Sequence, residues 1–109
     1  MPENKIDKIK EIINSSENLS HEKKEKTSQL LEELSAELSQ LKIAEEKLDS
    51  VTDFAQISHK ELSKKESDGG LIDIALSGLK KSVEDFEEEH PQLTSVINSI
   101  CTNLSNTGL

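Results

Sequence analysis

The sequence predicts an all-α protein, either an antiparallel helical bundle or a long helical hairpin with coiled-coil-like packing. The chain has 109 residues, of which 32% are hydrophobic and 32% charged, and its aromatic side chains are Phe54 and Phe86. Apolar side chains recur every three or four residues through most of the chain, which is the spacing of a helix stripe. A core of this composition must come from Leu, Ile and Val on such stripes. We therefore expect residues 1–109 to form a single small helical domain.

The first predicted helix is short and amphipathic, covering about residues 3–14. Isoleucines recur along it at helical spacing, at Ile6, Ile9, Ile12 and Ile13. The run of Asn and Ser at 14–16 ends it. Ser20 is the expected N-cap of a second helix that begins near His21, because a serine hydroxyl can accept a hydrogen bond from the first helical turn.

The second predicted helix is long and carries imperfect heptads. Apolar residues recur seven apart at Leu34, Leu41, Leu48, Ala55 and Leu62. Glu37 and Ser58 interrupt the pattern, and residues 49–53 can cap a new helix. We therefore assign 1–48 to the N-terminal helices and 49–70 to a variable or bent connection. The KKESDGG segment at 64–70 has the composition of a linker.

The last third of the chain, residues 71–109, is predicted to form a helix pair. Its apolar series keeps the same phase on both sides of His90 and Pro91. Pro91 lacks a backbone donor and disfavours helical angles at His90, so the simpler interpretation is a break with Pro91 opening the last helix. A kinked continuous helix stays open as the alternative. Gly78 lies beside Ala75 and Ser82, a row of small residues that lets another helix approach closely.

Residues 92–109 contain no charged side chain, although the chain is otherwise rich in charge. We predict that one face of this segment is an association seam formed by Val96, Ile97, Ile100 and Leu104. Its other faces carry Ser, Thr and Asn, which fits contact on two sides, with this chain or with another copy. We therefore expect a homo-oligomer, most simply a dimer that shares a helical bundle.

The segment FEEEHP at 86–91 and the residues after it resemble the C-terminal signature of a family of small bacterial proteins, domain of unknown function 4404. The matching residues are Phe86, Glu87, His90, Pro91 and Leu93, with Asn106, Gly108 and Leu109 at the end. The first helices resemble the family in leucine spacing, whereas about 43–70 matches no part of it that we can assign. The resemblance implies a soluble bacterial helical protein and implies no activity.

His90 is the first candidate for a functional residue, because three glutamates precede it and a proline follows it. It either closes the corner between two helices or makes a pH-responsive contact with neighbouring carboxylates. Cys101 is expected to be a buried thiol. A metal site would need distant residues to converge, namely His21, His59, His90 and Cys101. These residues lack short ligand spacing, so we expect no metal and no cofactor.

The formal net charge of −9 limits the classes of partner that the chain is expected to bind. Nucleic acid and anionic membranes are not expected partners, because both attract clustered Lys and Arg. No catalytic motif is present, and no apolar run approaches the roughly 18 residues of a membrane span. We expect a cytoplasmic, non-enzymatic module that binds protein, either itself or an unidentified partner. The alternative is an acidic regulator that mimics the charge of nucleic acid and occupies a basic protein, although interspersed lysines in the first 48 residues argue against it.

Overall fold

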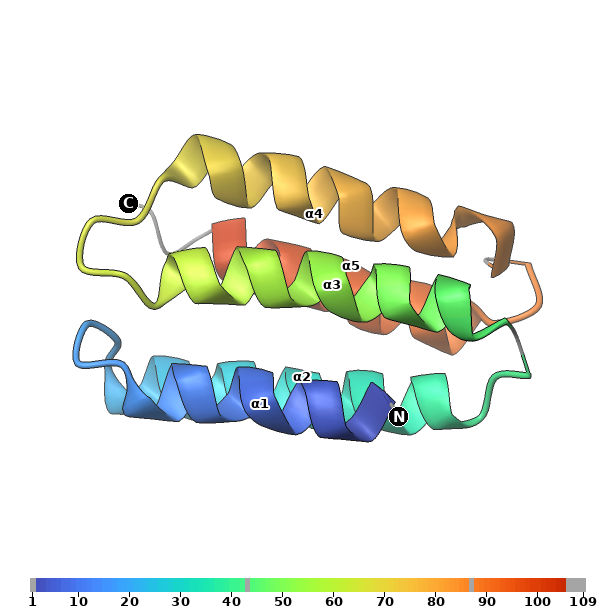
Figure 1. Cartoon of the computed structure of the whole chain (residues 1–109), viewed down its shortest axis with the longest axis horizontal. Helices are drawn as coiled ribbons and strands as arrows, with labels where there is room; N and C mark the ends of the chain where they lie inside the picture. Colours follow the sequence, from blue (N-terminus) through green and yellow to red (C-terminus); the bar gives the residue numbers. More distant parts are fainter. Residues whose placement is uncertain (1, 43, 87, 106–109) are drawn as a thin grey trace.

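The computed structural model describes residues 2–42, 44–86 and 88–105. The described chain is all-α, as predicted, with helices α1 (Pro2–Ser15), α2 (His21–Ser39), α3 (Glu45–Leu62), α4 (Gly69–Val83) and α5 (Pro91–Ser105). A short 3-10 turn, η1 (Glu84–Phe86), follows α4. Each helix runs antiparallel to the preceding one, in layers of α1 with α2, α3 with α5, and α4 alone (Figure 1). The globule measures 37 × 24 × 21 Å.

The first helix has close to the predicted bounds, and the second begins at the predicted position. Three of the isoleucines of α1 are buried, namely Ile6, Ile9 and Ile13. The hydroxyl of Ser20 accepts a hydrogen bond of 3.1 Å from the backbone N–H of Lys23, so the predicted N-cap of α2 is confirmed. This bond satisfies one of the backbone donors that the first turn of a helix leaves free.

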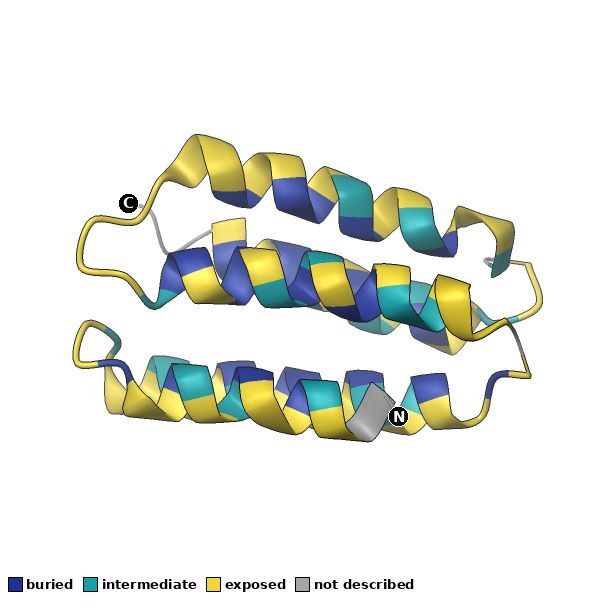
Figure 2. Cartoon of the chain, in the orientation of Figure 1, coloured by how far each residue is buried: buried dark blue, intermediate teal, exposed yellow. Residues whose placement is uncertain are grey.

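The predicted long second helix is wrong, because it is two antiparallel helices, of which α2 packs against α1 and α5 whereas α3 packs against α1 and α4. α2 ends at Ser39 and α3 begins at Glu45. The backbone N–H of Gln40 donates to the carbonyl of Glu37 at 3.2 Å and tightens the last turn of α2. Reversal at this point lets the leucines of α2 and the apolar stripe of α3 enter one core (Figure 2). A long helical hairpin would have left much of those stripes in water.

The stretch 49–70, predicted as a variable or bent connection, is mostly helix. α3 runs without interruption through 49–53 to Leu62, and α4 already begins at Gly69. Asp68 caps α4, since its carboxylate accepts from the backbone N–H groups of Gly70 at 2.9 Å and Leu71 at 3.2 Å. The two glycines therefore open a helix rather than end a linker.

The side chain of Glu61 stabilises the short connection between α3 and α4. Its carboxylate accepts from the backbone N–H of Asp68 and from the Lys64 Nζ, each at 3.0 Å. These bonds, first to Lys64 and then to the backbone of Asp68, lower the pKa of Glu61 below its ordinary value. The connection is fixed at both ends, by the side chain of Glu61 and by the cap at Asp68.

α3 and α4 come together where Gly78 meets Phe54. A Cβ atom at Gly78 would overlap the ring of Phe54, so the small residue is what allows this approach. Nearby Ala75 is 3% exposed and belongs to the same interface. The predicted role of the small residues in close helix approach is confirmed at Gly78.

Candidate interaction surface

The corner between α4 and α5 contains the family motif. The backbone N–H of His90 donates to the carbonyl of Phe86 at 2.8 Å, and the His90 carbonyl accepts from Leu93 at 3.0 Å and Thr94 at 3.4 Å. Pro91 is the first residue of α5. The interpretation of a break is therefore confirmed, and the kinked continuous helix is wrong. Pro91 needs no partner for a backbone N–H at this position.

The motif residues fix this corner against the core. Leu93 is 1% exposed, and Phe86 packs against the core from its edge. The Lys47 Nζ lies 5.2 Å from the centre of the Phe86 ring and 3.2 Å from a carboxylate oxygen of Asp85. Glu87 lies outside the described residues. A pH-responsive contact of His90 stays a prediction, since the described carboxylates form no ion pair with its ring.

The predicted association seam on α5 lies inside the single chain. Ile97, Ile100 and Leu104 are each 1% exposed, and Val96 is half-buried at the edge of the core. α5 packs against α2 and α4. Three of the four seam residues are therefore covered by helices of the same chain.

Part of the uncharged face of α5 is also used within the chain. The Lys23 Nζ donates to the backbone carbonyl of Asn103 at 2.6 Å and to its side-chain oxygen at 2.9 Å. The Asn103 amide in turn donates to the Thr27 hydroxyl at 3.0 Å. Burial lowers the pKa of Lys23. These bonds join α2 to α5 and leave an open polar groove lined mainly by residues of α5, among them Thr94, Ser95, Asn98 and Ser99.

The buried titratable side chains of His59 and Cys101 lie in surroundings that suit a structural role. His59 is 1% exposed, and its Nδ1 lies 2.7 Å from the Ala55 carbonyl, the geometry of an N–H donor. Burial lowers the pKa of His59 to about 4, so the ring is neutral near pH 7. Cys101 is buried as predicted, and burial raises the pKa of its thiol. Among the described residues, no three His, Cys, Asp or Glu side chains gather in a way that could hold a metal ion.

An exposed apolar surface lies over α3 and α4, and sequence reasoning missed it. Ile74 is 70% exposed, Ile57 46% and Leu71 39%, next to the half-buried ring of Phe54. We name these four residues the α3–α4 face. A groove continues the face past Gly78 and is lined by Lys47, Ser50, Phe54, Gly78, Lys81, Ser82 and Asp85. One signal was available, because the run LIDIAL at 71–76 has more apolar residues than one buried stripe can use.

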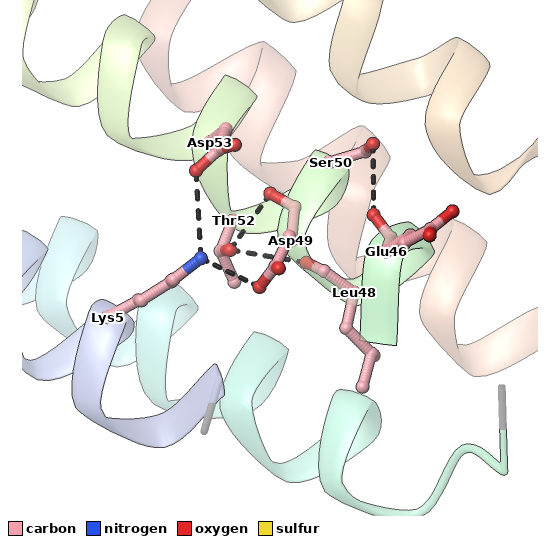
Figure 3. A network of polar contacts seen from close by, with 7 residues as sticks. All are labelled: Lys5, Glu46, Leu48, Asp49, Ser50, Thr52 and Asp53. Carbon is pink, nitrogen blue, oxygen red and sulfur yellow. Dashed lines mark hydrogen bonds and ion pairs between the residues drawn. The ribbon is translucent and has the colours of Figure 1, made fainter. Parts of the chain in front are cut away.

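The flank of α3 beside this face is held by α1. The Lys5 Nζ lies 2.7 Å from Asp49 and 3.9 Å from Asp53 (Figure 3). The hydrogen bond to Asp49 is the main cause that raises the pKa of Lys5. On the same turns, the Thr52 hydroxyl donates to the carbonyls of Leu48 and Asp49. α3 is thereby bound to its neighbour on one side and presents Ile57 outward.

The described residues form five α-helices around a common core, with an exposed apolar face on α3 and α4. The chain matches the family described as Domain of unknown function (DUF4404) over residues 28–109, and it belongs to that family. The match runs through 43–70, so the interpretation that left this stretch outside the family is wrong. It begins within α2 and leaves out α1. The chain matches no curated protein sequence and no solved structure.

None of the described helices is both long enough and apolar enough to cross a membrane.

Proposed function

We propose that this chain is a cytoplasmic protein-interaction module, without catalysis of its own, that acts by associating with itself. The observation that carries the proposal is the exposure of Ile74, 70% of whose surface is open to water, on the same face as Ile57 and Leu71. Single exposed apolar side chains are ordinary on protein surfaces, whereas a contiguous group marks a site of association.

The distribution of charge supports association at this face. The chain has a net charge of −9, so two copies repel each other over most of their surface. α4 is an exception, because its two lysines and one aspartate give it a formal charge of +1. α3 has two lysines and five acidic residues, a formal charge of −3. The helices that carry the α3–α4 face thus bear charges of both signs, which permits attraction between copies.

The finer features of the proposal follow from the same surface. A dimer is the simplest closed assembly of identical copies. Coiled-coil-like packing within each copy is supported by the heptad step from Leu31 to Leu38, both buried in α2. The buried seam on α5 provides the core of each copy, and the α3–α4 face provides the contact between copies.

The molar mass in solution tests this function. Light scattering on a sizing column, detected by refractive index because the chain has no Trp or Tyr, gives the mass directly. We expect about 24 kDa, twice the chain mass of 12.1 kDa, with the apparent mass falling on dilution. A mass of 12.1 kDa at every concentration, up to the highest that stays in solution, would mean that the chain does not self-associate.

A further inference from the structure

We infer that the α3–α4 face takes a second copy of this chain, with α3 of each copy lying against α4 of the other. The inference rests on the proposed function and deepens it by naming the surface, the occupant and the arrangement. Its first support is that Ile57 on α3 and Ile74 on α4 are both exposed, each one helical turn from the contact between Phe54 and Gly78.

The contact between Phe54 and Gly78 sets the level of the two isoleucines along the helices. Ile57 lies three residues after Phe54, which is about 4.5 Å along α3. Ile74 lies four residues before Gly78, which is about 6 Å in the same direction because α4 runs antiparallel to α3 (Figure 1). The two side chains are therefore nearly level. A two-fold axis in the plane of the face, parallel to the helices, places Ile57 of each copy on the partner's Ile74.

The charges beside the isoleucines fit the same axis at one end of the face. Lys60 follows Ile57 by one turn on α3, and Asp73 directly precedes Ile74 on α4; both are exposed. Asp73 lies on the flank of α4 that faces α5, far from Lys60 of its own chain. Neither Asp73 nor Lys60 forms an ion pair with the described part of the chain. The two-fold axis brings Lys60 next to the partner's Asp73, twice in each dimer.

A second pair of charges fits at the other end. Lys81 follows Gly78 by three residues, and Asp53 directly precedes Phe54, so the two lie within about 3 Å of the same level. Both side chains are exposed, and Asp53 also lies 3.9 Å from the Lys5 Nζ of its own chain. The same axis sets Lys81 opposite the partner's Asp53. Opposite charges at the rim of an apolar contact add little affinity and mainly speed the encounter of the two surfaces.

One other two-fold arrangement would bury the same isoleucines, and charge reversal distinguishes the two. If α3 lay against α3, Lys60 would meet the partner's Asp53, and Asp73 would meet the partner's Lys81. In our arrangement Lys60 and Asp73 form the pair themselves. Exchanging the charges of Lys60 and Asp73 therefore preserves their attraction only when α3 of one copy lies against α4 of the other.

The first experiment locates the face. Ile74→Asp is expected to run at the monomer mass of 12.1 kDa where the wild type is a dimer, with unchanged circular dichroism because Ile74 is 70% exposed. The control Gln29→Asp makes the same charge on the exposed side of α2 and should stay dimeric. If Ile74→Asp and Gln29→Asp are both dimeric, the chain self-associates but its copies do not meet at the α3–α4 face. A monomeric wild type would remove both the inference and the proposed function.

The second experiment decides the arrangement, by measuring the dimer dissociation constant of Lys60→Glu, Asp73→Lys and the double variant. Each single reversal turns two attractive pairs into repulsive ones and should raise the constant about tenfold. The double variant should return to within about threefold of the wild type. A double variant weaker than either single one, or single variants equal to the wild type, would overturn the arrangement of α3 against α4.

Discussion

The ring of Phe54 lies against the backbone of Gly78. It occupies the place that the Cβ atom of any other residue at position 78 would need. We therefore expect Gly78→Ala to lower the free energy of unfolding by about 1–2 kcal/mol. Overpacking costs about 1–3 kcal/mol, and the better helix propensity of alanine returns up to about 1 kcal/mol. Urea unfolding followed by circular dichroism measures the difference.

Ser77→Ala is the matched control for that variant, since Ser77 is the exposed neighbour of Gly78 on α4. It should change the free energy of unfolding by less than about 0.5 kcal/mol. Adding Phe54→Ala to Gly78→Ala removes the overlap, so the effect of the alanine should then become stabilising. A stabilising Gly78→Ala in the presence of Phe54 would show that the ring does not occupy this position.

His59 should make the stability fall in mild acid. Its pKa is lowered from 6.5 to about 4 by burial, so the folded chain holds fewer protons than the unfolded chain between these values. The contribution of the neutral ring is fully present above pH 6.5 and is lost as the pH falls toward 4. Between pH 7 and pH 5 we expect a loss of about 2 kcal/mol in the free energy of unfolding.

Two variants isolate this histidine. His59→Leu removes the titrating group, so the free energy of unfolding should change little between pH 7 and pH 5, whatever its absolute value. The exposed His21 has its Nε2 2.9 Å from a carboxylate oxygen of Glu25 on the surface of α2, and His21→Gln should keep the wild-type loss. Retention of the full loss in His59→Leu would assign the pH dependence to another group.

The cap of α4 gives a third prediction. The Asp68 carboxylate accepts from two backbone N–H groups, those of Gly70 and Leu71. Asp68→Ala should lower the free energy of unfolding by about 1 kcal/mol, whereas Asp68→Asn keeps an acceptor and should lose less than half of that. Ser67→Ala, one residue earlier and exposed, is the control and should have no effect beyond about 0.5 kcal/mol. Equal losses in Asp68→Asn and Asp68→Ala would contradict a capping role.

The sequence predicted the elements that local signals define. Ser20 and Pro91 mark the beginnings of α2 and α5 through a hydroxyl cap and a missing backbone donor, and both signals act within a few residues. The segment 40–44 between α2 and α3 contains neither Gly nor Pro, so no local sequence signal predicts the end of α2. α2 and α3 separate because folding back buries both of their apolar stripes, a tertiary gain that outweighs helix propensity.

The proposed surface for association, the α3–α4 face, was harder to predict because it too depends on tertiary packing. Ile74 and Ile97 have the same side chain, yet one is 70% exposed and the other 1%. Periodicity assigns both to helix stripes and cannot tell which stripe finds a neighbour within the chain. The uncharged composition of α5 predicted a seam there, and the hydrophobic side of α5 is covered by α2 and α4 of the same chain.

The seam on α5 gives the last prediction, which separates the core from the surface. Ile100 is 1% exposed, so Ile100→Asp would bury an unpaired carboxylate and leave a cavity, at a cost above about 4 kcal/mol. We expect most of the helical circular dichroism at 222 nm to be lost at every protein concentration. Ser99→Asp adds the same charge on the exposed side of α5 and should leave the signal intact. If Ile100→Asp instead gave a fully helical monomer, Ile100 would belong to a contact between copies, and the α3–α4 face would lose its role as the site where copies meet.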